Sequence, residues 1–396
     1  MAAFTLPISP PELATPVHAG VGVLFQERAL ASLRSAPCEN GAYWKAVLTE
    51  GSKAFAPNLR SRPGWISNGD HGWPVTVHDG PEGNSFPGSM LTQYVAYPRA
   101  EIEVIPAGVQ RLAARLGLHG FNTLLHIAQA DRVVQWNSWL LSTNLHSAGL
   151  AQSVDAITGI LRDEFPDHAI LLKNVDPMGD PALIPNLERA GYDLMTSRQV
   201  FFFDGRTAEF WGKSTVKREV KEFAGDARYR WVEPEEFTPA DAPRIVQLYH
   251  QLYLEKHSRL NPQYTARFVE RALTERWLEF HGLRDAQGTI VGVFGFFTND
   301  GVASVPFIGY DTRLPQEAGL YRRLFTGILK TIAERRQLLN YSSGAGDFKR
   351  RRGGIPVIEF NAVYSRHLSP VRQAAFRLAG KLLNHYARPW LEEHSH

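Results

Sequence analysis

One stretch of the chain decides the fold: Thr289-Ile-Val-Gly-Val-Phe-Gly-Phe-Phe-Thr298, then Asn299-Asp-Gly301, then Val302-Ala-Ser-Val-Pro-Phe-Ile-Gly-Tyr310. Two apolar runs flank a short turn, and Asn or Asp followed by Gly is favoured in tight turns whose residues need positive φ. The stretch therefore predicts a β-hairpin. Its most apolar part, Ile290 to Phe297, is far shorter than the roughly 18 to 20 residues that span a bilayer.

Regular elements are predicted on both sides of this hairpin. Upstream, apolar residues at helical spacing predict helices over Pro243 to Lys256 and Thr265 to Arg276, followed by a strand. Downstream, a long helix is predicted from about Glu317 to Arg336. Two strands follow, Leu338 to Tyr341 and Pro356 to Tyr364, and an amphipathic helix from Pro370 to about Tyr386 closes the order.

A similar order of elements is predicted in the first half, after about 60 largely irregular residues. Strands are expected at Met90 to Ala96, Thr123 to Ile127 and Val133 to Leu141, a helix from Ser153, then Ala169 to Lys173 and Val200 to Phe203 as strands around a short helix. This order is not the regular alternation of a doubly wound sheet. We predict a mixed α/β fold of two similar domains, 1–205 and 206–396, that meet near Gly205, each a mixed sheet flanked by helices.

Composition fits two soluble domains. The chain has 396 residues, 44% of them apolar and 21% charged, and its length exceeds that at which one core keeps growing. A net charge of +3 gives no global reason to expect nucleic acid or an anionic membrane as partner, although a local basic patch remains possible. The start, MAAFTLPISPPELATP, lacks the positive n-region of a secretory signal, so a cytoplasmic location is expected.

Cys38 is the single cysteine, which excludes an intramolecular disulfide and a multi-cysteine zinc site. Its neighbours include no cation that would lower the pKa of the thiol, so a cysteine nucleophile is not favoured. The 14 histidines form no H-E-x-x-H pattern, and no G-x-S-x-G is present. We therefore predict neither a metal site nor a hydrolase nucleophile.

The first candidate site is the junction between the strand ending at Tyr310 and the long helix. A helix amino terminus offers unpaired N–H groups and a positive dipole end to a phosphate. Gly319 would allow close approach to the backbone, and Arg322 and Arg323 add charge. An ordinary helix start with a solvated Arg pair remains the alternative.

The second candidate is the loop Tyr341-Ser-Ser-Gly-Ala-Gly-Asp-Phe-Lys-Arg-Arg-Arg-Gly-Gly354. Four consecutive cations between glycines suit a loop that faces an anion, and the loop follows a strand of the predicted sheet directly. Phe348 and Lys349 form an apolar and cationic pair within it. A charge run is more often simply solvated, and that alternative stays open.

Two resemblances arise from these segments. Gln316-x-x-Gly319-x-Tyr321 is similar to the Q/R-x-x-G-x-G/A pyrophosphate loop of the GNAT acyltransferases, with Tyr321 in place of the last small residue. Gly346-Asp-Phe-Lys349 resembles the FemAB-like branch of that superfamily, whose fold is two tandem GNAT domains. Lys213 to Lys221 and Leu183 to Tyr192 are similar to further elements of the same branch.

The resemblance implies transfer of an acyl or aminoacyl group to an amine of a small molecule or peptide. It places Lys349 where a cation would stabilise charge on the transferred carbonyl. Glu359 is a candidate general base, and Tyr310 and Tyr341 are candidate proton donors to the leaving group. The residues expected to bind the donor are Gln316, Gly319, Tyr321, Arg322, Arg323, Phe348 and Arg350.

The donor is left open between coenzyme A thioester and aminoacyl-tRNA, and no tightly bound cofactor is expected. The Gln316 to Tyr321 segment favours a thioester, whereas the basic clusters at Lys213 to Lys221 and Lys349 to Arg352 favour tRNA. A non-catalytic binding module is the alternative from another class, because the pyrophosphate motif is incomplete.

Overall fold

A computed structural model describes residues 22–35, 38–67, 71–80, 84–103, 107–147 and 149–394. The amino-terminal residues considered for a secretory signal lie outside these ranges. The strands are β1 Leu24–Phe25, β2 Arg62–Ser67, β3 Gly72–Asp79, β4 Arg132–Trp136, β5 Ala169–Val175, β6 Asp193–Asp204, β7 Tyr229–Val232, β8 Glu279–Asp285, β9 Ile290–Asn299, β10 Val302–Tyr310, β11 Leu338–Asn340 and β12 Ile355–Tyr364.

The helices in these residues are α1 Gln26–Ser35, α2 Gly41–Glu50, α3 Ser52–Phe55, α4 Tyr97–Ile102, α5 Val109–Ala128, α6 Leu150–Glu164, α7 Leu183–Ala190, α8 Ser214–Ala224, α9 Ala242–Tyr249, α10 Ala266–Glu275, α11 Leu320–Arg335, α12 Gly346–Arg350, α13 Pro370–Leu382 and α14 Arg388–His394. Segments Thr92–Ala96, His250–His257 and Leu383–Ala387 are π-helical, and Glu209–Gly212, Pro234–Glu236, Pro239–Asp241 and Gln316–Ala318 are 3₁₀-helical.

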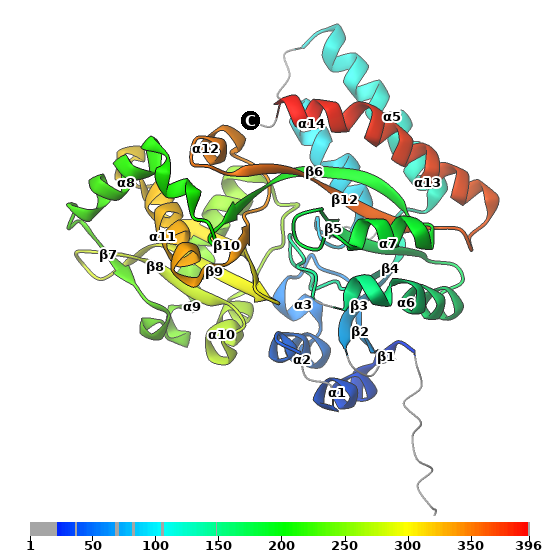
Figure 1. Cartoon of the computed structure of the whole chain (residues 1–396), viewed down its shortest axis with the longest axis horizontal. Coiled ribbons are helices and arrows are strands. Elements are labelled where there is room, and N and C mark those ends of the chain that lie inside the picture. Colours follow the sequence, from blue (N-terminus) through cyan, green and yellow to red (C-terminus); the bar gives the residue numbers. More distant parts are fainter. Residues whose placement is uncertain are drawn as a thin grey trace, which may run out of the picture.

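All described strands form one 12-stranded sheet with the order β1-β2-β3-β4-β5-β12-β6-β11-β10-β9-β8-β7 (Figure 1). Within it β4 pairs with β5, and β10 with β11, in parallel. The order has the same pattern from either end, because each half contributes five strands in sequence and then exchanges its sixth. β12, from the end of the chain, thus lies beside β5, and β6 lies beside β11.

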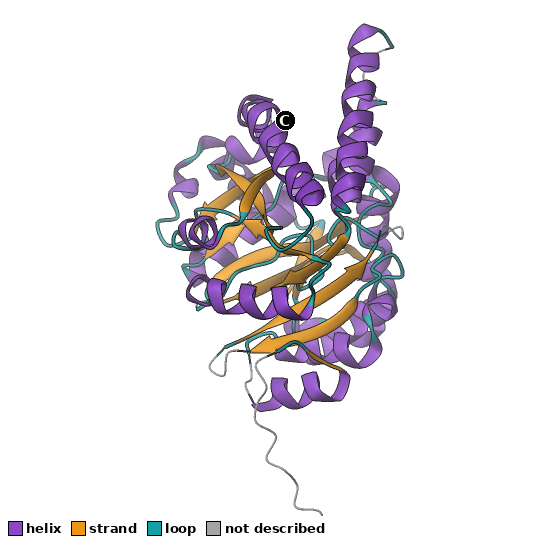
Figure 2. Cartoon of the chain, turned by 90° about the vertical axis from the view of Figure 1, so that its right-hand side faces the viewer, coloured by secondary structure: helices purple, strands orange, loops and turns teal. Residues whose placement is uncertain are grey.

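This exchange corrects one expectation. The fold is mixed α/β with helices on both faces, as predicted, but the halves do not have separate sheets (Figures 1 and 2). β6 and β12 pair antiparallel from Phe202–Ile355 to Asp193–Val363 and join the halves. The chain leaves β6 at Asp204, next to Gly205, and the division into 1–205 and 206–396 stays a prediction.

The core consists of helix–sheet layers on both faces. In the first half, α6 and α7 cover one face, and α5 and α13 cover the other. In the second half, α11 covers one face, while α9 and α10 cover the other together with α2 and α3. Strands such as β9 are buried on both faces, which explains why their sequences are apolar throughout.

The predicted hairpin is confirmed: Asn299 pairs with Val302, and Asp300 and Gly301 have φ of 51° and 77°. Three other expectations are wrong. The first 60 residues contain α1 to α3, residues 92–96 are π-helical, and Thr123 to Ile127 belongs to α5. Short apolar runs do not distinguish a strand from a helix, and here packing against the sheet selected helix.

Candidate functional site

The parallel strands β10 and β11 separate near the middle of β10. Their register runs from Val302–Leu338 to Ser304–Asn340, after which β10 continues to Tyr310. Beyond Asn340 the chain turns sharply, with Ser342, Gly344 and Ala345 at φ of 58°, 79° and 50°. Two of these residues are not glycine, and such backbone is strained and is concentrated at functional sites. The separating segments frame the site predicted from the sequence.

Aromatic side chains fill the space between these segments. The ring of Tyr321 lies 6.1 Å from that of Tyr310 and 5.0 Å from that of Phe348, measured between centroids. Tyr341 packs edge-on against Phe325 at 5.0 Å. The structure thus brings together four of the predicted site residues, three of them phenols.

Burial raises the pKa of two of these phenols above its ordinary value. It raises the pKa of Tyr321 to about 12, and burial together with the nearby Tyr321 raises the pKa of Tyr341 well above its usual value. Tyr310 is only partly buried, and the Lys256 ammonium donates a hydrogen bond to its hydroxyl over 3.3 Å. Among the three phenols, Tyr310 is therefore the one whose hydroxyl accepts a hydrogen bond from a lysine ammonium.

Lys349 lies at the back of the turn and is fully buried. Its ammonium donates to the backbone carbonyls of Tyr341, Ser342 and Ser343 at 2.9, 3.1 and 2.8 Å. An ammonium has three N–H groups, so these bonds use all of them. Burial, and secondarily the Arg198 charge, lower the pKa of Lys349 well below its usual value. In this structure Lys349 holds the strained turn and does not face an open site.

The start of α11 has the backbone expected of a close approach, but its arginines are paired. Gly319 has φ of 63° and precedes the first turn of the helix, and Gln316 is exposed just before it. Arg322 bonds Glu222 at 3.1 and 3.2 Å. Arg323 is buried, bonds the carbonyl of Ala318 and pairs with Asp226. The alternative of a solvated Arg pair is therefore wrong, and donor binding by Arg322 and Arg323 stays a prediction.

The cations of the basic run 349–352 also differ from one another in their partners and burial. Arg350 donates to Gln199 Oε1 at 2.9 Å. Arg352 is buried against Glu219 of α8, with its guanidinium 3.4 Å from the ring centroid of Phe348. Arg351 remains exposed. The loop is thus neither simply solvated nor a uniform anion site.

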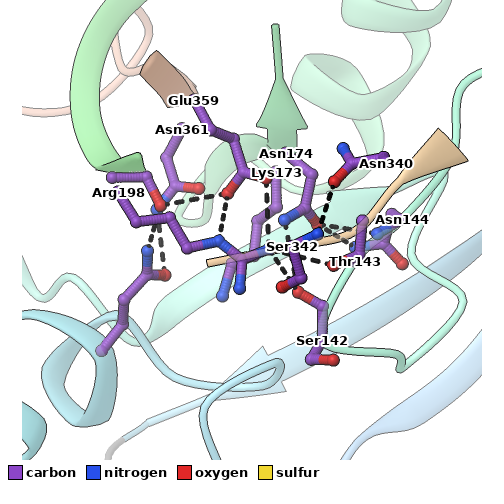
Figure 3. A network of polar contacts seen from close by, with 12 residues as sticks. Ser142, Thr143, Asn144, Lys173, Asn174, Arg198, Asn340, Ser342, Glu359 and Asn361 are labelled. Atoms are coloured by element: carbon purple, nitrogen blue, oxygen red, sulfur yellow. Dashed lines mark hydrogen bonds and ion pairs between the residues drawn. The ribbon is translucent and has the colours of Figure 1, made fainter. Parts of the chain in front are cut away.

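Glu359 lies apart from the phenols, in a buried polar network where the two halves join (Figure 3). Arg198 donates to both of its carboxylate oxygens, at 2.8 and 3.1 Å, and also to the carbonyl of Ser142. A fully buried carboxylate in such a pair is not an accessible proton acceptor. Glu359 is thus buried in an ion pair in this structure, and its role as general base stays a prediction.

Lys173 is, like Arg198, a member of this network that the sequence analysis did not identify. It is buried on β5 and donates to the carbonyls of Phe86 and Pro87 at 2.9 and 3.3 Å. Burial, and then the Arg198 charge, lower its pKa to about 7. The available signal was a single lysine closing the apolar run Ala169-Ile-Leu-Leu-Lys173.

Other chemistry finds little support in the described residues. No group of three His, Cys, Asp or Glu side chains in these ranges could hold a metal ion. Burial raises the pKa of the Cys38 thiol to about 11, so the thiolate nucleophile is disfavoured there. None of the described helices is long and apolar enough to cross a membrane.

Comparison with known proteins places this site in a recognised domain. Residues 212–350 match the family "Acetyltransferase (GNAT) domain". This range includes the candidate site residues from Tyr310 to Arg350. The GNAT resemblance predicted from Gln316 to Tyr321 is thereby confirmed. No curated protein matches the chain by sequence.

Several solved structures match the chain at low identity. FemX is 7% identical with a TM-score of 0.49, over 88% of this chain and 97% of its own. A tandem GNAT protein from the clavulanic acid biosynthesis pathway is 12% identical with a TM-score of 0.38, over 85% and 91%. L-PGS from Bacillus licheniformis is 14% identical with a TM-score of 0.43, over 58% and 79%.

Proposed function

We propose that this chain, which carries a GNAT domain at residues 212–350, transfers an acyl or aminoacyl group from an activated donor to an amine of a small molecule or peptide. The observation that carries the proposal is the separation of β10 and β11 beside the start of α11, with Tyr310, Tyr321 and Tyr341 gathered there. This arrangement places a helix amino terminus and proton-bearing groups around one space.

The reaction needs a neutral amine, a polarised carbonyl and a proton for the leaving group. The amine nitrogen forms a bond to the carbonyl carbon, and collapse of the tetrahedral adduct breaks the bond to the thiol or ribose oxygen. The amine loses one proton to water, and the departing group takes one from the enzyme. We assign that proton donation to Tyr310, since its hydroxyl lies at an exposed position and accepts a hydrogen bond from the Lys256 ammonium.

Lys349 acts as a positioning residue in this proposal, because its three N–H groups are engaged by the turn 341–343. The earlier alternative, direct stabilisation of the acyl oxygen, would require one of these bonds to break. Lys349→Arg and Lys349→Met distinguish the two roles. Loss of positioning should raise KM and lower stability together, whereas loss of direct stabilisation should lower kcat about 10²- to 10³-fold at unchanged KM.

We propose an acyl thioester as the donor, in line with the Gln316 to Tyr321 segment. One observation favours aminoacyl-tRNA instead: α8 and the residue before it expose Lys213, Lys217, Arg218 and Lys221. Thermal unfolding with coenzyme A and with tRNA compares the two. Binding to tRNA should weaken steeply with salt, and stabilisation by tRNA but not by coenzyme A would replace the thioester.

A non-catalytic binding module is the second candidate. It is favoured by the aromatic rings that fill the space between β10 and β11 and by the acidic partners of Arg322, Arg323 and Arg352. Donor binding would require Tyr321 and Phe348 to move. Absence of stabilisation by both donors would favour this module over the enzyme.

Turnover provides the direct test of the enzyme. Thiol release from acetyl coenzyme A is measured with a panel of amines, for the wild type and for Tyr310→Phe. Loss of a general acid should lower kcat by about 10²-fold or more. Tyr386→Phe, at an exposed tyrosine of the π-helical segment 383–387, is the matched control and should leave kcat unchanged. Equal turnover of both variants contradicts the assignment of Tyr310.

A further inference from the structure

Helix α5 exposes apolar side chains along one stripe. Val109, Leu112 and Leu116 follow each other at helical spacing and are between 58% and 83% exposed. Figures 1 and 2 show this end of α5 projecting beyond the sheet and the helices that cover it. Exposed leucines and valines in series are unusual on the surface of a soluble domain and mark interaction sites.

A second apolar stripe lies on the long helical segment that ends the chain. α13, the π-helical segment 383–387 and α14 continue one another, and α13 packs against α5. Large apolar side chains on this segment are between 49% and 68% exposed; they are Val371, Leu378, Tyr386 and Trp390. Both helices lie at the same end of the molecule in Figures 1 and 2. We call the exposed sides of 109–128 and 370–391 the helical end.

The charge of the helical end differs from that of the rest of the chain. Residues 109–128 and 370–391 contain six Lys and Arg and no Asp or Glu, and Glu392 and Glu393 follow in the last turn of α14. All other residues together hold 37 Lys and Arg against 40 Asp and Glu, so the remainder is negative. Some of the six are engaged: Arg372 is buried, and Arg115 and Arg388 pair with Glu103 and Glu392. Arg377 and Lys381 are exposed beside Leu378.

We propose that the helical end docks on the surface of an anionic lipid bilayer. Exposed aliphatic and aromatic side chains would enter the boundary between headgroups and acyl chains, and the cations would meet the anionic headgroups. A second copy of the chain would bring two surfaces of the same positive sign together, which is unfavourable. A nucleic acid would meet the cations but offers no hydrocarbon for Val109, Leu112 and Leu116.

The test is co-sedimentation of the full-length chain with vesicles, without any acyl donor. We expect binding to vesicles of phosphatidylcholine mixed with phosphatidylglycerol and much weaker binding to phosphatidylcholine alone. Leu112→Gln combined with Leu116→Gln should reduce binding about tenfold or more, since both side chains lose their burial in the bilayer. Arg377→Gln combined with Lys381→Gln should reduce it by a similar factor, and added salt should have the same effect.

Leu314→Gln is the matched control, because Leu314 is an exposed leucine outside the helical end, and its binding should equal that of the wild type. Equal binding to both vesicle types, or binding unaffected by the Leu112 and Leu116 changes, overturns the proposal. Capture of a single-stranded RNA oligonucleotide without capture of vesicles also overturns it. So does a dimer in sedimentation equilibrium that the Leu112 and Leu116 changes dissociate. Circular dichroism of each variant establishes that the fold is kept.

Discussion

The two halves of the sheet share one strand geometry but surround it with different side chains. In each, a parallel pair separates after three register pairs, β4 from β5 in one half and β10 from β11 in the other. In each, a buried lysine then donates to backbone carbonyls. Lys173 lies beside an Arg–Glu ion pair at the join between the halves, whereas Lys349 lies behind a group of phenols. The strand pattern alone therefore does not locate the site; the side chains after the strands do.

The exchange of β6 and β12 explains why the polar network lies where the two halves join. β12 brings Glu359 from near the end of the chain to Arg198 of β6. The halves are thus held by a buried ion pair as well as by strand pairing. Removal of either partner would leave an unpaired buried charge at this join, which is costly.

The largest expected effect comes from breaking that join. Arg198→Met leaves the Glu359 carboxylate buried without its partner, and we expect a loss of about 3 to 5 kcal/mol in the free energy of unfolding. Urea denaturation measures it. Arg388→Gln, at an exposed Arg–Glu pair, is the control and should change stability by less than about 1 kcal/mol. If the two variants cost the same, the buried pair does not hold the halves; adding Glu359→Gln to Arg198→Met should recover part of the loss.

The second largest effect is the contribution of Lys173 to the pH dependence of the free energy of unfolding. Its folded pKa of about 7 lies below the value of about 10.4 for an unfolded lysine. Between these values the unfolded chain binds more protons, so stability should rise with pH by up to about 1.4 kcal/mol per unit. Lys349, whose pKa is lowered too, contributes in the same direction.

Urea denaturation at a series of pH values from 7 to about 9.5 measures this slope. In Lys173→Met the part of the slope due to Lys173 should disappear. The slope is the readout, because the variant also leaves two carbonyls without a donor. An unchanged slope would mean that Lys173 keeps its ordinary pKa in the folded chain.

The sequence predicts the second half better than the first, for a physical reason. The hairpin at Asn299-Asp-Gly301 and the helix from Leu320 are encoded locally, by turn chemistry and apolar spacing. The single continuous sheet is not, because the pairing of β6 with β12 joins residues far apart in the chain. The polar partners are not encoded locally either, because no residue near Glu359 in the sequence indicates that Arg198 is its partner.

A smaller effect tests the start of α11. Gly319→Val places a β-branched residue at φ of 63°, which costs about 1 to 2 kcal/mol and shifts the turn. If the donor binds there, its affinity should fall about tenfold in a calorimetric titration with coenzyme A. Gly288→Val is the control: Gly288 has φ of 79° in the turn between β8 and β9, with nothing close to an added Cβ. It should lose similar stability and keep donor affinity; equal affinities in both variants exclude the α11 start as the donor site.

The smallest effect on stability is expected at Arg351, which the sequence alone does not distinguish from its neighbour Arg352. Arg351 and Arg352 are neighbours in one basic run, yet Arg351 is exposed and lies 3.8 Å from Asp347, whereas Arg352 is buried against Glu219. Arg351→Gln should change the free energy of unfolding by no more than about 0.5 kcal/mol, since exposed pairs contribute little. Arg352→Gln leaves the buried Glu219 carboxylate with only the Arg322 guanidinium, 3.7 Å away, and should cost several-fold more. Parallel urea titrations compare them. Equal losses would mean that the run acts as one solvated loop and that the pairing of Arg352 with Glu219 of α8 does not hold the turn behind the phenols.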